Sequence, residues 1–182
     1  MFMSLKLLKL RCRIFFWTIF GKIKKLDSRL QLTLTKGHPE SVLIVFPMDE
    51  QSFRVACYAF RDLGKKDGQK IKFIFLVKDQ FKDLFYLQMG DTMFIRHSDQ
   101  YTILSDEKLV LQVLKQYKFD IIVDLNYKFH LGIARLISGL TSDMKIGFVS
   151  DFSDRFYNIQ LNISKSGIME KGFKQINWIL AQ

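Results

Sequence analysis

Three nearly continuous apolar runs constrain how this chain can fold more than any other feature. They lie at residues 41–46 (SVLIVF), 71–77 (IKFIFLV) and 119–125 (FDIIVDL). A strand with one face in water alternates apolar and polar residues, whereas a strand covered on both faces is apolar along its length. The three runs therefore predict strands inside a sheet that has helices on both sides.

Segments with helical spacing of apolar residues alternate with these runs. We expect helices at 51–63, 79–88, 105–117, 127–140 and 168–180, and further strands at 92–95, 144–149 and 157–163. Such alternation is typical of βαβ units with right-handed crossovers. The predicted fold class is therefore α/β, a Rossmann-like, mostly parallel sheet flanked by helices. Ligand sites of such sheets lie at the carboxyl ends of the strands. In this chain the candidate loops are 47–52, 78–80, 96–104, 126–130 and 149–155.

The positive charge of the chain is concentrated at its N-terminus. The 182 residues suffice for one domain with a sizeable core, and the formal net charge is +10. The first 25 residues carry seven of the 28 basic residues and none of the 18 acidic ones. An anionic surface is the partner that this segment favours. Because the rest of the chain is nearly balanced, we expect no nucleic-acid partner.

Residues 1–26 mix bulky apolar and basic side chains as an amphipathic helix does. The apolar stretch is shorter than the roughly 20 residues that span a bilayer, and no secretory cleavage site is visible. Three interpretations stay open: a helix on an anionic membrane surface, a helix packed on the domain, and a partner-binding helix. We favour the first, with membrane contacts from Phe15, Phe16, Trp17, Phe20, Lys6, Lys9 and Arg13.

The domain organisation predicted from these patterns has three parts. Residues 1–26 form the basic amphipathic helix, residues 27–40 a connector with a short edge strand, and residues 41–182 the Rossmann-like α/β domain. Cys12 and Cys57 provide no disulfide framework, so we expect reduced thiols and a cytoplasmic location.

Local motifs for cofactors and nucleophiles are absent. The loop after the first strand (PMDEQS) has no glycine-rich fingerprint, no P-loop occurs, and no Gly-x-Ser-x-Gly elbow is present. The histidines His38, His97 and His130 have no metal-ligand spacing to one another or to the cysteines. We expect no cofactor and no metal.

Several polar residues follow predicted strands and are candidates for a site. Asp49 is either a general base or the cap of the next helix. Asp124, beside Asn126, anchors an acceptor, orients a loop or caps the next helix. His97, with the arginine before it, either binds phosphate or is solvated, and the same alternatives hold for Arg155.

Residues 41–163 resemble the N-terminal half of family 9 glycosyltransferases, the bacterial lipopolysaccharide heptosyltransferases. The segment YKFDIIVDLNYKFHLGIARLISGL is similar to that family's "fDlvIDlq" strand and following helix. MKIGFVSD is similar to its "riGf" segment, and a tyrosine-containing segment (FYN) follows. The resemblance implies that Asp49 is a rough counterpart of the catalytic base, without the glycine that precedes it in the family. Lys145 stands where the family usually has arginine.

The family also has a second Rossmann-like domain that binds the nucleotide sugar, and this sequence ends at Gln182. The resemblance therefore implies a heptosyltransferase-like domain that acts on a lipid-linked or phosphorylated sugar acceptor at the inner membrane surface. A partner chain would supply the donor site, and Asp124, Asn126, Lys145 and Arg155 would bind substrate. The alternative is a non-catalytic, membrane-associated binding or scaffold domain of the same fold.

Overall fold

The computed structural model describes residues 5–23, 26, 39–63, 71–97, 99–163 and 168–180. Within these ranges six strands form one sheet in the order β3-β2-β1-β4-β5-β6, and every neighbouring pair is parallel. The strands are β1 (Ser41–Val45), β2 (Lys72–Lys78), β3 (Asp91–Ile95), β4 (Phe119–Asp124), β5 (Ser142–Phe148) and β6 (Ile159–Leu161). The predicted Rossmann-like α/β fold is confirmed.

The three apolar runs are β1, β2 and β4, which lie side by side in the sheet. In β1 every residue after Ser41 is buried, because helices cover both faces of the sheet. The register pairs Val45 of β1 with Leu76 of β2 and with Asp124 of β4. The strand order therefore reverses its direction between β1 and β4, where ligands bind in many sheets of this type.

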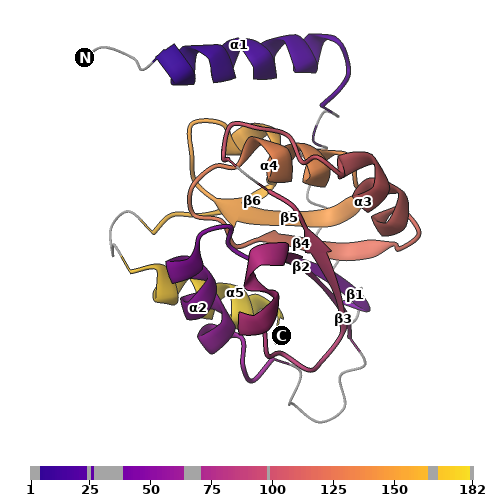
Figure 1. Cartoon of the computed structure of the whole chain (residues 1–182), viewed down its shortest axis with the longest axis vertical. Helices are drawn as coiled ribbons and strands as arrows, with labels where there is room; N and C mark the ends of the chain where they lie inside the picture. Colours follow the sequence, from indigo (N-terminus) through magenta and orange to yellow (C-terminus); the bar gives the residue numbers. More distant parts are fainter. Residues whose placement is uncertain are drawn as a thin grey trace.

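Two layers of helices enclose the sheet (Figure 1). The helices are α1 (Leu5–Ile19), α2 (Glu50–Ala59), α3 (Glu107–Leu114), α4 (Leu131–Ser138) and α5 (Met169–Leu180), with 3₁₀ turns η1 (Asp79–Leu84) and η2 (Ser153–Arg155). Apolar residues of α3 and α4 form one core with the sheet face that they cover. Residues of α2, α5 and η1 form the second core on the opposite face, which is rich in phenylalanine.

The predicted helix at 79–88 is instead the shorter 3₁₀ helix η1. The chain leaves it at Phe85, whose ring packs edge-on against Phe46 and Phe75 at centroid distances of 5.2 and 5.5 Å. Packing of this ring in the core thus outweighs continuation of the helix. The predicted edge strand and most of the connector, residues 27–38, lie outside the described residues.

Helix α1 lies on the outer side of α4 (Figure 1). Its residues Leu10 and Ile14 are buried in the same core cluster as α3 and α4. The guanidinium of Arg135 on α4 stacks over the Trp17 ring at 4.5 Å. Arg11 pairs with Asp151 at 3.6 Å. The interpretation of this segment as a helix packed on the domain is therefore correct for one of its faces.

Candidate functional site

A fully hydrogen-bonded carboxylate marks the point where the strand order reverses. Asp124 ends β4 and is buried, and its Oδ1 accepts from the backbone N–H of Asn126 at 2.9 Å and from Asn126 Nδ2 at 2.7 Å. The Tyr157 hydroxyl donates to Asp124 Oδ2. Asn126 Oδ1 in turn accepts from the backbone N–H of Met48 at 2.8 Å. Together these bonds fix the loop after β1 to the loop after β4.

Burial raises the pKa of the Asp124 carboxyl, and the bonds from Tyr157 and Asn126 oppose that shift. Burial and the neighbouring carboxylate also raise the pKa of Tyr157 well above its ordinary value. The bonds of Asp124 to Asn126 and Tyr157 match the interpretation in which it orients a loop. Substrate binding by Asp124 and Asn126 stays a prediction.

Asp49 lies in the loop after β1 and caps the N-terminus of α2. Its Oδ1 accepts from the backbone N–H of Ser52 at 3.0 Å and from the Ser52 hydroxyl at 2.8 Å. The backbone of Asp49 is extended, as is usual for the residue that caps a helix at its N-terminus. The capping interpretation is therefore correct. The role of Asp49 as a general base stays a prediction.

Two histidines that are far apart in the sequence meet at the same edge of the sheet. His97 follows β3, His130 precedes α4, and Nε2 of His97 lies 2.9 Å from Nδ1 of His130. His97 is 7% exposed, which contradicts the interpretation of a solvated loop residue. The remaining ring nitrogen of His97, Nδ1, is buried and has no hydrogen-bond partner among the described residues.

The hydrogen bond between the rings leaves this nitrogen unsatisfied in either tautomer. If His97 Nε2 donates, Nδ1 is an unused acceptor, and if His130 donates, Nδ1 is an unused donor. A buried polar atom without a partner costs about 1–3 kcal/mol. Burial lowers the pKa of His97, and the Lys78 ammonium adds to that shift. Burial and the neighbouring His97 lower the pKa of His130 to about 4.

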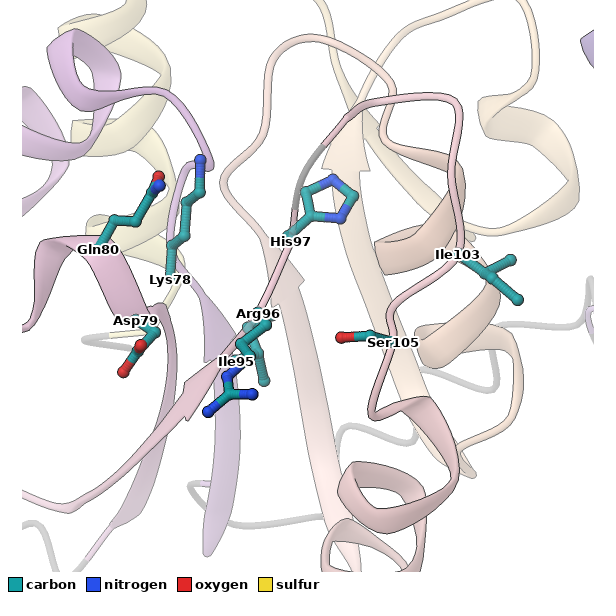
Figure 2. A pocket seen from close by; sticks show the side chains of 8 residues that line it. All are labelled: Lys78, Asp79, Gln80, Ile95, Arg96, His97, Ile103 and Ser105. Carbon is teal, nitrogen blue, oxygen red and sulfur yellow. The ribbon is translucent and has the colours of Figure 1, made fainter.

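A cavity of about 420 Å³ lies beside the histidine pair, at the carboxyl ends of β2 and β3. Figure 2 shows Lys78 and Gln80 on one side of it, Ser105 on the other, and Arg96 and His97 between them. The lining residues are Lys78, Asp79, Gln80, Ile95, Arg96, His97, Ile103 and Ser105. Two cations against one carboxylate make the cavity suited to an anion that also carries hydroxyl groups.

The two cations predicted from the resemblance to bind substrate do not line this cavity. Lys145 lies within β5, where its buried ammonium donates to the carbonyl oxygens of Ile137 at 3.0 Å and Leu140 at 2.7 Å. These bonds stabilise the C-terminal end of α4, and substrate binding by Lys145 stays a prediction. Arg155 Nη1 donates to Thr18 Oγ1 of α1 at 3.1 Å.

Sequence reasoning missed Lys78 and His130 as site residues. Lys78 is the polar residue that ends the apolar run of β2, and this signal identifies the carboxyl end of a buried strand. His130 has no comparable signal, because only the folded chain brings it to His97. Within the described residues, no group of three or more His, Cys, Asp or Glu side chains is placed to hold a metal ion.

The predicted membrane contacts lie on α1 and at Phe20 directly after it, and six of the seven are exposed. Trp17 is the exception, because its ring packs on the domain beneath Arg135. We define the outer face of α1 as its exposed apolar residues Leu5, Leu8, Phe15, Phe16 and Ile19, together with the exposed Phe20 directly after the helix. This face lies opposite Leu10 and Ile14, so α1 is apolar on two sides. None of the described helices has the length and apolar content needed to cross a membrane.

The strand order and the helices on both faces of the sheet define a Rossmann-like α/β chain with a cavity at the carboxyl edge of the sheet. No family model matches the sequence, and no curated protein matches it. A structure of E. coli heptosyltransferase WaaC with ADP is similar, with 16% identity and a TM-score of 0.57 over 75% of this chain and 46% of that chain. The same enzyme with ADP-2-deoxy-2-fluoro heptose gives 17% identity and a TM-score of 0.57 over 75% and 47%.

This chain thus spans about half the length of the structures that it matches. At this level of identity the similarity shows a heptosyltransferase-like fold and does not assign the chain to family 9.

Proposed function

We propose that this chain is a heptosyltransferase-like domain that binds a phosphorylated or lipid-linked sugar acceptor at the carboxyl edge of its sheet. The observation that carries the proposal is the cavity lined by Lys78, Arg96 and His97, in a fold similar to a heptosyltransferase. Lys78 and Arg96 would hold a phosphate, and the Gln80 and Ser105 side chains would bind sugar hydroxyls. A ligand group that reached the His97 ring would supply the partner that its Nδ1 lacks.

Calorimetric titration of the full chain with sugar phosphates and nucleotide sugars tests this proposal. Lys78→Gln/Arg96→Gln removes both cations of the cavity, and Lys108→Gln/Lys171→Gln removes the same charge from exposed helix positions outside it. We expect the cavity variant to weaken sugar-phosphate binding about tenfold or more, because charge-assisted bonds are lost. Equal affinities of the two variants, or no saturable binding by the wild-type chain, would overturn the proposal.

The alternative, a non-catalytic binding or scaffold domain of the same fold, is favoured by the bonds of Asp49. Its Oδ1 already accepts two hydrogen bonds from Ser52. Asn caps helices as well as Asp does, so Asp49→Asn keeps the cap and removes only the basicity. If Asp49 contacts the acceptor as a base, the variant weakens ligand binding at unchanged stability. If ligand binding and stability both stay unchanged, the scaffold function is the correct one.

We further propose that the domain works at an anionic membrane surface, with the outer face of α1 in the interfacial region. Phe15, Phe16 and Ile19 are each more than half exposed, which leaves an apolar surface in water. Lys6, Lys9 and Arg13 lie beside this face and would attract anionic lipid.

Co-sedimentation with vesicles of phosphatidylglycerol and phosphatidylcholine tests this docking. Deletion of α1 is a poor variant, because Leu10 and Ile14 belong to the core. Phe16→Gln/Ile19→Gln changes only the outer face, and we expect it to reduce the bound fraction while the free energy of unfolding stays the same. Vesicle binding that does not respond to these substitutions would exclude the outer face as the docking surface.

A further inference from the structure

A second cavity of about 410 Å³ lies between α1 and the loop that follows β3. It is lined by Lys6, Lys9, Leu10, Arg13, Asp99 and Tyr101. Arg13 Nη1 donates to the Tyr101 carbonyl oxygen at 3.2 Å, which ties α1 to this loop. The cavity is separate from the one at the carboxyl ends of β2 and β3, and the two share no lining residue.

The charges around the second cavity are not balanced. Lys6, Lys9 and Arg13 face a single carboxylate, Asp99, whose Oδ1 already accepts from the backbone N–H of Tyr101 at 2.9 Å. Neither Lys6 nor Lys9 has an ion-pair partner in the part of the chain that the structure describes. An anion in the cavity would therefore meet two uncommitted ammonium groups and the guanidinium of Arg13.

The position of these bases relative to the outer face of α1 limits what the anion can be. Lys6, Lys9 and Arg13 are three and four residues apart, so they form one stripe along the helix. This stripe runs between the buried side at Leu10 and the outer face, which includes Phe16. An anion in the cavity would thus have an exposed apolar surface beside it.

We propose that the second cavity binds the phosphate headgroup of an anionic lipid, whose chains lie along the outer face of α1. The inference rests on the proposed membrane docking and adds a defined headgroup site to it. The three bases contact the phosphate, and the outer face contacts the first methylene groups of the chains. A free phosphate compound would use only the bases, and a second copy of this chain would use only the outer face, so neither matches both features.

A soluble lipid separates this site from general attraction to a charged membrane. Dihexanoyl phosphatidylglycerol below its critical micelle concentration is titrated into the full chain by calorimetry, beside glycerol 3-phosphate and dihexanoyl phosphatidylcholine. Lys6→Gln/Lys9→Gln removes two ammonium groups of the cavity, and Lys22→Gln/Lys115→Gln removes the same charge from the turn after α1 and the end of α3, outside the lining. All four side chains are exposed, so both variants should fold.

We expect saturable binding of the anionic short-chain lipid, weakened about tenfold or more by the cavity variant and about twofold or less by the control. Binding of glycerol 3-phosphate as tight as that of the lipid would show a free-phosphate site and overturn the lipid assignment. Equal effects of the two variants would show nonspecific charge attraction only, which overturns it as well. Self-association that the phenylalanines of the outer face mediate, with no lipid binding, would point to a second copy.

The outcome can be told apart from that of the proposed docking. If the wild-type chain does not bind the short-chain lipid but binds vesicles through the outer face, the headgroup site is rejected and the membrane docking stands. If the wild-type chain binds neither the short-chain lipid nor vesicles, the headgroup site and the membrane docking are both rejected. Sugar-phosphate binding at the cavity beside His97 is measured separately, and it does not depend on either result.

Discussion

Two polar clusters lie at the carboxyl edge of the same sheet, and they differ in how completely they are hydrogen-bonded. In the first, Asp124 accepts from both N–H groups of Asn126 and from the Tyr157 hydroxyl. In the second, the His97 and His130 rings bond to each other, and His97 Nδ1 has no partner among the described residues. Native proteins rarely leave buried polar atoms unpaired, so the unpaired nitrogen of His97 requires an explanation.

A buried cluster whose bonds are complete contributes to the fold and has little left to offer a ligand. A cluster with an unpaired atom costs stability, and the cost is recovered when a ligand or an ordered water supplies the partner. The comparison therefore supports a structural role for the Asp124 cluster and the proposed ligand site beside the histidine pair. The predictions below are ordered by the size of the effect expected on the free energy of unfolding.

Asp124→Ala should have the largest effect. The substitution leaves the Tyr157 hydroxyl and the Asn126 side chain buried without an acceptor, and we expect a loss of about 3–4 kcal/mol in urea unfolding. Asp120→Ala is the matched control on the same strand. Asp120 accepts from the backbone N–H groups of Glu40 and Ser41 but is only half-buried, so its loss should cost about 1 kcal/mol. Equal losses would remove the structural assignment of Asp124.

The histidine pair should make stability depend on pH. The pKa of His130 falls from 6.5 in the unfolded chain to about 4 in the folded protein, chiefly by burial. The unfolded state therefore binds its proton first as the pH falls. The stability contributed by neutral His130 is present above pH 6.5 and is lost as the pH falls to about 4. The loss should reach about 2–3 kcal/mol.

The measurement for this prediction is the free energy of unfolding between pH 7 and pH 4, in the wild-type chain and in His97→Phe/His130→Asn. The difference between the two curves removes the contribution of carboxylates that titrate in the same range. The lowered pKa of His97 acts in the same direction as that of His130. Parallel curves would mean that the pair has the same pKa values in the folded and the unfolded state, which would contradict the lowered pKa values of the two rings.

The two clusters also differ in how far the sequence predicts them. The apolar runs of β1, β2 and β4 predict the central strands, and the Rossmann-like class follows from their alternation with helices. The resemblance marks the strand that ends in Asp124 and the segment that contains Tyr157, although not their bond. The histidine pair joins residues 33 positions apart. Their meeting depends on how α4 and the loop after β3 pack, which no local pattern of residues records.

The faces of α1 show a second limit of sequence reasoning. Trp17 is of a residue type that is common at membrane surfaces, yet Arg135 of α4 covers its ring. A helix with apolar residues on two sides does not reveal which side packs on the domain, because that choice depends on the surface of α4 and the neighbouring loops. The sequence does predict the helix itself and the exposure of Phe15, Phe16 and Phe20.

Gly147→Ala should have an intermediate effect that acts through the Asp124 cluster. A Cβ atom at Gly147 would lie 2.7 Å from the Tyr157 ring, so the ring must move and its hydroxyl shifts from Asp124. We expect a loss of about 1–3 kcal/mol in urea unfolding. In a Tyr157→Phe background the same substitution should cost less, because the hydroxyl bond is already absent. Additive effects in this double-mutant cycle would separate Gly147 from the cluster.

His97→Phe should have the smallest effect on stability and a large one on ligand binding. Phenylalanine fills the volume of the imidazole ring and removes the unpaired nitrogen, while His130 keeps access to water because it is only half-buried. We expect the free energy of unfolding to change by less than about 1 kcal/mol in either direction. Binding of a sugar phosphate that contacts the ring should weaken in the same variant. A loss of stability as large as that for Asp124→Ala would make both clusters structural, and the ligand site would then rest on Lys78 and Arg96 alone.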